Sequence, residues 1–174
     1  MPALIAMCGL PFSGKSVLAR ALSRELRIRL LSYDAEIYPA NRRAAPAGAS
    51  LAAEYDFVQG IARREIAEIL AGGESLIYDD LLLDREDRRK LAAVAKAHWA
   101  GYVLVYLDTP LPVIEERRAA NSRTRARASV PDGKIRTDAA LLQPPDEAEQ
   151  AIYVSPEYVL PEVLAKVSAR LGGR

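Results

Sequence analysis

The chain has 174 residues with a formal net charge of +1, and half of its residues are apolar. This composition is typical of a globular protein with a buried core, and the length predicts one domain over residues 1–174. The near-zero charge argues against a nucleic-acid coat protein. One cysteine, Cys8, excludes an intramolecular disulfide. No apolar run approaches the roughly 20 residues that span a bilayer, and the first ten residues indicate a strand rather than a signal peptide. We therefore expect a cytoplasmic protein with no membrane partner.

Strand and helix signals alternate along the chain. Apolar runs predict strands at residues 4–8, 28–31, 75–80, 102–109 and 151–155, and helical spacing predicts helices at 16–25, 51–70, 84–98, 111–127 and 161–171, with a shorter helix inside 130–150. Residues 38–50 are rich in Pro, Ala and Gly and are expected to form a loop beside the substrate. The alternation predicts an α/β fold with a mostly parallel sheet between two helical layers.

The segment GLPFSGKS, at residues 9–16, completes the pattern Gly-x4-Gly-Lys-Ser between a predicted strand and a predicted helix. Its glycines let backbone N–H groups point inward, where they and the helix N-terminus bind phosphate oxygens. Lys15 is expected to reach the β- and γ-phosphates of ATP, and the Ser16 hydroxyl is expected to bind Mg²⁺. A chance glycine-rich turn is the alternative, which the complete pattern and its context disfavour. The predicted nucleotide-binding residues are Gly9, Pro11, Phe12, Ser13, Gly14, Lys15, Ser16 and Val17.

Carboxylates follow the predicted second and third strands. Asp34 stands where a parallel sheet presents its ligand crevice, so it is a candidate base for an attacking hydroxyl, or else the N-cap of the next helix. Asp79 comes first after the apolar run SLIY and is the predicted Walker B ligand of Mg²⁺. For Asp80, contact with the substrate and capping of the next turn both remain open.

A basic helix follows the fourth predicted strand. It carries Arg117, Arg118, Arg123, Arg125 and Arg127. One interpretation is an arginine-rich lid, at about residues 117–136, that closes over the phosphates and excludes water. A solvated face and a patch that binds RNA or DNA backbone are the alternatives.

The stretches GLPFSGKS, SYD, GGESLIYDD and VLVYLDTPLPVIEERR, with the basic segment after them, resemble P-loop kinases of the AAA_33 or zeta-toxin-like group. That group includes the kinase domain of phage polynucleotide kinase and antibiotic O-phosphotransferases. The stretch VPDGKI…LLQPPDE is similar to the segment after the lid in seryl-tRNA kinase-like proteins. The resemblance, over about residues 3–150, implies a P-loop NTPase fold and transfer of the ATP γ-phosphate to a hydroxyl. It also implies that Asp34 is the base.

The chain departs from the group at two places. Members often carry an arginine shortly after the aspartate, whereas here the nearest are Arg42 and Arg43. The lid often shows two arginines four residues apart, whereas Arg117 is followed at that spacing by Asn121, with Arg123 nearby.

These patterns predict an ATP-dependent kinase that uses Mg²⁺. The predicted catalytic residues are Asp34, Lys15, Arg117 and Arg123, and the predicted metal ligands are Ser16 and Asp79. A hydroxyl-bearing small molecule is the expected acceptor. A polynucleotide or tRNA kinase with the same site is one alternative, and a regulatory ATPase without an acceptor is another. The sequence leaves the oligomeric state open.

Overall fold

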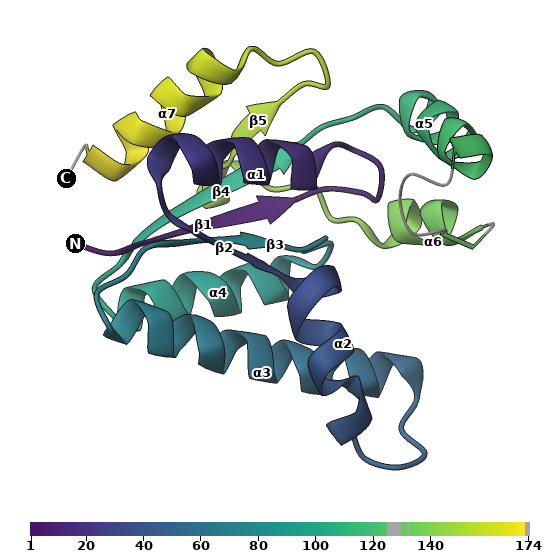
Figure 1. Ribbon diagram of the computed structural model, residues 1–174, viewed down its shortest axis with the longest axis horizontal. Coiled ribbons are helices and arrows are strands. Elements are labelled where there is room, and N and C mark those ends of the chain that lie inside the picture. The colour runs from purple at the N-terminus through teal and green to yellow at the C-terminus, as the bar shows by residue number, and fades with distance from the viewer. Residues whose placement is uncertain (125–129, 132, 173–174) are drawn as a thin grey trace.

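The computed structural model describes residues 1–124, 130–131 and 133–172 (Figure 1). Arg125 and Arg127, which belong to the predicted lid, lie outside the described residues. The strands of the described part are β1 (Ala3–Cys8), β2 (Arg29–Ser32), β3 (Leu76–Asp79), β4 (Gly101–Leu107) and β5 (Ile152–Val154). Its helices are α1 (Lys15–Leu26), α2 (Tyr38–Asn41), α3 (Leu51–Ala71), α4 (Arg85–Ala97), α5 (Leu111–Thr124), α6 (Lys134–Leu141) and α7 (Leu160–Gly172), and the shorter helical turns are η1 (Tyr33–Ile37), η2 (Arg42–Ala44) and η3 (Glu147–Glu149).

The strands form one five-stranded sheet in the order β2-β3-β1-β4-β5, and every pair is parallel. Helices α1 and α7 cover one face, and α3 and α4 cover the other, so the chain has three layers (Figure 1). This confirms the predicted α/β/α architecture. The sheet is parallel throughout its described strands, where the sequence predicted it to be mostly parallel.

The central strand β1 is buried along its whole length, as expected for a parallel sheet covered on both faces. Because side chains alternate between the faces of a strand, Leu4, Ala6 and Cys8 pack in the core under α3 and α4. Ile5 and Met7 pack in the second core, under α1 and α7. The carboxyl end of β1 therefore lies at the middle of the sheet, with helical layers on both sides.

The segment after β2 corrects the sequence analysis. Residues 38–44, predicted as part of a loop, are helical, because η1, α2 and η2 follow one another without a break. Ser32 caps this run by accepting a hydrogen bond from the Ala35 N–H, and the Glu36 carboxylate accepts one from the Ser32 N–H. Tyr33 is buried and holds the run against the core. Only residues 45–50 form the loop that the sequence predicted.

None of the helices in the described ranges is both long enough and apolar enough to cross a membrane. The other predicted elements are present, with bounds that differ by a residue or two. The predicted helix at 111–127 is observed as α5 up to Thr124, and its last three residues lie outside the described ranges.

Candidate active site

The segment Gly9–Gly14 curls tightly between the end of β1 and the start of α1. Its backbone takes positive φ angles at Gly9 (141°), Phe12 (60°) and Gly14 (107°). A Cβ atom on Gly9 would lie 2.9 Å from the carbonyl oxygen of Leu107, so the close approach to β4 requires glycine. Phe12 adopts the left-handed region without being glycine, which strains the loop. The loop has the geometry that a phosphate-binding turn needs.

The residue that begins α1, Lys15, is buried inside this loop. Its Nζ donates a hydrogen bond to the Leu10 carbonyl oxygen at 2.9 Å. Burial lowers the pKa of Lys15, and the carboxylates of Asp79, Asp80 and Asp34 oppose this shift. The structure therefore brings the predicted phosphate-binding lysine into the electrostatic field of the carboxylates at the carboxyl ends of β2 and β3.

Ser13, inside the loop, has a buried hydroxyl with no hydrogen-bond partner in the described part of the chain. A buried polar atom without a partner is rare, because its desolvation is not compensated. The backbone of Ser13 is held from outside: Thr109 Oγ1 donates to its carbonyl oxygen at 3.0 Å, and Arg117 Nη1 donates to the same atom at 2.8 Å. The unpaired hydroxyl and the supported backbone fit a loop that closes around an anion.

Asp79 is the last residue of β3 and is buried beside the loop. Burial raises the pKa of Asp79, while the positive charge of Lys15 and a hydrogen bond from Ser16 partly oppose the rise. The pair formed by the Ser16 hydroxyl and the Asp79 carboxylate offers the oxygen ligands that Mg²⁺ prefers. These two side chains thus fit the predicted magnesium site.

Asp34 lies in the first turn of η1, directly after β2, and its side chain is exposed. The N-cap of this helical run is Ser32, so the alternative role of Asp34 as the cap is wrong. An exposed carboxylate at the carboxyl end of β2 is accessible to an acceptor. The role of Asp34 as a base stays a prediction.

Asp80, whose role the sequence left open, is the centre of a buried polar network. Its Oδ2 accepts hydrogen bonds from Gln59 Nε2 at 2.5 Å and from the hydroxyls of Tyr55 and Tyr78, each at 3.4 Å. Its Oδ1 accepts one from the Leu81 N–H. Burial raises the pKa of Asp80 to about 6, although the bonds from Gln59 and Leu81 oppose the rise. No sequence pattern predicts this network, because its members come from α3, from β3 and from the residues just after β3.

A row of tyrosines lies beside this network. The ring of Tyr33 packs 5.3 Å from that of Tyr55 and 5.7 Å from that of Tyr38, measured between centroids. The Tyr33 hydroxyl is buried and has no hydrogen-bond partner among the described residues. Aromatic side chains therefore wall the site on the side of α2 and α3.

The remaining predicted residues lie around the loop. Pro11 is half-buried in the loop, Val17 is exposed in the first turn of α1, and Arg123 is exposed in the last turn of α5. Arg117 also donates to the Phe12 carbonyl oxygen at 3.3 Å, so its guanidinium lies against the outside of the loop. Whether the two arginines contact phosphate stays a prediction.

Residues 4–145 match the family model AAA_33, described as an AAA domain. The chain belongs to the AAA_33 family. This confirms the resemblance drawn from its motifs. A comparison of this AAA_33 chain with curated proteins finds no match.

Solved structures similar to the AAA_33 chain are kinases or share their fold. A gluconokinase from Sinorhizobium meliloti 1021 is 26% identical, with a TM-score of 0.70 over 99% of this chain and 93% of that one. Kti12 from Chaetomium thermophilum, solved in complex with ADP-AlF3, is 19% identical, with a TM-score of 0.76 over 97% and 98% of the two chains. The Mycobacterium tuberculosis APS kinase CysC, in complex with AMPPNP and APS, is 21% identical, with a TM-score of 0.67 over 98% of each chain. The chain has a kinase-like P-loop fold.

Proposed function

We propose that this AAA_33 chain is an ATP-dependent kinase, acting as one domain, that transfers the γ-phosphate of ATP to a hydroxyl of a small molecule. The observation that carries the proposal is that a buried lysine, three carboxylates and an unpaired hydroxyl come together at the phosphate loop. Buried Lys15 lies in the field of Asp79, Asp80 and Asp34, beside a curled loop with an unpaired Ser13 hydroxyl. The nucleotide complexes of the similar Kti12 and APS kinase structures support nucleotide binding at such a fold.

Each residue has a role that follows from its place. The loop N–H groups and the first turn of α1 bind phosphate oxygens, and Lys15 leaves its bond to Leu10 to neutralise the transferring phosphate. Ser16 and Asp79 would hold Mg²⁺, which supplies positive charge at the phosphates when bound. Asp34, exposed after β2, orients the acceptor hydroxyl and accepts its proton.

The lid is the second part of the proposal. Residues 117–136 are proposed to close over the phosphates, with Arg117 and Arg123 contributing charge. Closure would exclude water, which otherwise competes with the acceptor hydroxyl for the phosphate. The contact of Arg117 with the loop supports this proposal, because it holds the middle of α5 against the loop that is proposed to bind phosphate.

The test is phosphate accounting with γ-labelled ATP and Mg²⁺. The acceptor panel holds sugars, sugar acids, nucleosides, aminoglycosides, 5′-hydroxyl oligonucleotides and tRNA, and the control is Lys15→Ala. Label on a small molecule, lost in the control, is the expected result. Label on an oligonucleotide or tRNA would replace the small-molecule acceptor with a nucleic acid. Label released only as inorganic phosphate, at one slow rate whatever is added, would favour a regulatory ATPase.

A further inference from the structure

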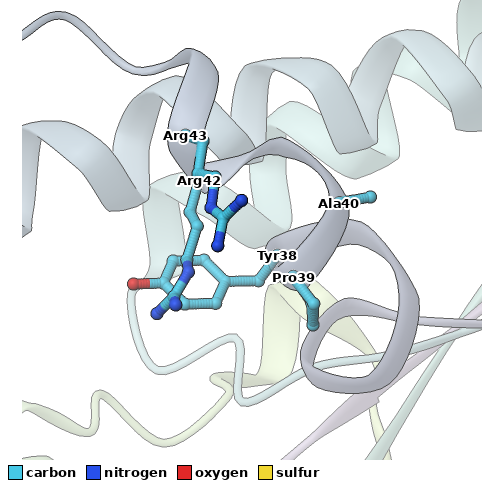
Figure 2. A pocket seen from close by; sticks show the side chains of 5 residues that line it. All are labelled: Tyr38, Pro39, Ala40, Arg42 and Arg43. Carbon is cyan, nitrogen blue, oxygen red and sulfur yellow. The ribbon is translucent and has the colours of Figure 1, made fainter.

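A cavity of about 450 Å³ lies against the helical run that follows β2. It is lined by Tyr38, Pro39, Ala40, Arg42 and Arg43, all from α2 and η2 (Figure 2). The nucleotide loop contributes nothing to this lining, so the cavity is a separate feature. Its volume is within the range of about 300–1,000 Å³ that small-molecule sites occupy.

Two positive charges border the cavity. Figure 2 shows the guanidinium groups of Arg42 and Arg43 extending to the same side, towards Tyr38. The Arg42 guanidinium carbon lies 5.9 Å from the centroid of the Tyr38 ring. Within the described residues, neither arginine forms an ion pair with a carboxylate. Two adjacent guanidinium groups with donors to spare are suited to an anion.

Tyr38 holds one wall of the cavity in place. Its hydroxyl donates a hydrogen bond of 2.5 Å to Glu54 Oε1, on α3. Among the described residues, the Glu54 carboxylate is therefore engaged by Tyr38 and forms no ion pair with an arginine. Because the ring of Tyr38 is fixed, the guanidinium stacked over it is partly ordered before a ligand arrives.

The cavity and the proposed base lie on the same helical run, which consists of η1, α2 and η2. Asp34 is the second residue of this run, and Arg42 follows eight positions later, which corresponds to a rise of about 12 Å at the spacing of an α-helix. Helical side chains lean towards the N-terminus of their helix, so the arginines lean back towards Asp34. Since Asp34 is not among the residues that line the cavity, the proposal requires an acceptor long enough to reach from the arginines to Asp34.

We propose that the acceptor carries an anionic group, a carboxylate or a phosphate, which Arg42 and Arg43 bind while its hydroxyl lies at Asp34. This inference rests on the proposed kinase function and specifies its substrate class. A small anion fits better than a nucleic acid. Acidic residues accompany the two arginines, because Asp34 and Glu36 belong to the same helical run and Glu54 is bonded to Tyr38, so the local charge does not favour a polyanion.

The experiment measures binding, which does not depend on turnover. Isothermal titration calorimetry of the whole chain, with Mg²⁺ and a non-hydrolysable ATP analogue, compares three pairs that differ in the anion: D-gluconate with D-glucitol, D-glycerate with glycerol, and glucose 6-phosphate with glucose. The variants are Arg42→Gln/Arg43→Gln and the charge-retaining Arg42→Lys/Arg43→Lys. The control, Arg64→Gln/Arg89→Gln, removes two exposed arginines from α3 and α4 and so changes the net charge equally.

We expect the anionic member of at least one pair to bind at least about tenfold more tightly than its neutral partner. A preference in the gluconate or glycerate pair would indicate that the anionic group is a carboxylate. A preference in the glucose 6-phosphate pair would indicate that it is a phosphate. The preference should fall to about twofold in the glutamine variant, be intermediate in the lysine variant, and persist in the control. No preference in any pair, or a preference that survives in the glutamine variant, would overturn the proposal. Anion-selective binding without transfer of label from ATP would instead overturn the proposed kinase function.

Discussion

Arg117 donates hydrogen bonds from Nη1 to the carbonyl oxygens of Ser13 and Phe12, at 2.8 and 3.3 Å. These bonds join the first half of α5 to the phosphate loop. They satisfy carbonyl groups at the point where Phe12 holds a left-handed backbone conformation. Arg117 is therefore placed to stabilise the strained loop, and we propose that it also brings positive charge near bound phosphate.

Replacing Arg117 with alanine should weaken the use of ATP, because the loop loses its external support and a nearby positive charge. We expect kcat/KM for ATP to fall by about 100- to 1,000-fold, the range seen when an electrostatic donor is removed. The control is Arg64→Ala, which removes an exposed arginine of α3 that has no place in the proposed site. Equal losses in steady-state kinetics of the two variants would show that the contact with the loop has no special role.

Asp34→Asn should slow phosphate transfer while leaving nucleotide binding intact. The amide cannot accept the acceptor's proton, and general-base catalysis contributes about 100- to 10,000-fold. Single-turnover transfer of label should drop by this order, with the Kd for ATP unchanged. Asp56→Asn, an exposed aspartate on α3, is the control and should transfer label at the normal rate. If Asp34→Asn transferred label at the normal rate, Asp34 would not be the base.

The sequence predicted the parts of the fold that depend on local patterns. The run before Gly9 indicated a strand because buried parallel strands are continuously apolar, and the spacing in residues 51–70 indicated a helix. The segment at 38–44 was predicted wrongly because its Pro and Ala composition was taken for a loop signal. Ser32 caps the run, and Pro39 stands in the first turn of α2, where proline is tolerated.

For the candidate site too, the sequence predicted the residues that belong to local motifs and missed the contacts between distant residues. The glycine loop, Lys15 and Asp79 belong to motifs with fixed spacing, so the sequence reveals them. The bonds of Gln59 and Tyr55 to Asp80 join residues more than 20 positions apart, and no spacing rule specifies such pairs. The cavity at Arg42 and Arg43 likewise depends on a helical turn that the sequence did not reveal.

Gly9→Ala tests the close approach between the loop and β4. The new Cβ would lie 2.9 Å from the Leu107 carbonyl oxygen, at a φ of 141° that side chains rarely adopt. We expect unfolding free energy to fall by about 1–3 kcal/mol and ATP affinity to fall with it. The contrasting variant is Gly60→Ala, inside α3, where the Cβ meets only an arginine nitrogen at 3.8 Å. It should raise stability by up to about 1 kcal/mol in urea unfolding. A harmless Gly9→Ala would refute the steric argument.

Tyr33→Phe and Tyr78→Phe remove two buried hydroxyls that differ in their partners. The Tyr33 hydroxyl has none among the described residues, whereas the Tyr78 hydroxyl donates to Gln59 Oε1 at 3.2 Å and to Asp80 Oδ2. Tyr33→Phe should therefore leave the free energy of unfolding unchanged or raise it, while Tyr78→Phe should lower it by about 1–3 kcal/mol. Denaturant titrations of both variants give the comparison, and equal losses would mean that the Tyr33 hydroxyl has a partner in solution.

Arg88 and Glu149 form a buried ion pair that ties α4 to η3, the turn before β5. Arg88 Nε and Nη2 donate to the two carboxylate oxygens of Glu149 at 2.6 and 2.9 Å, and the Arg88 side chain is 1% exposed. Glu149→Gln should lower the unfolding free energy by about 3–5 kcal/mol, because it leaves the guanidinium buried without its counter-charge.

An exposed ion pair of the same chain provides the comparison for the cost of breaking this buried pair. Arg29 and Glu65 approach to 2.9 Å on the surface, with side chains 46% and 34% exposed. Because water screens that pair, Glu65→Gln should cost less than about 1 kcal/mol. The double variant Arg88→Met/Glu149→Leu should be more stable than Glu149→Gln, because no unpaired charge remains in the interior. Urea unfolding of the three variants measures the differences. If the double variant were the least stable of them, the pair would contribute net stability rather than only avoid an unpaired charge.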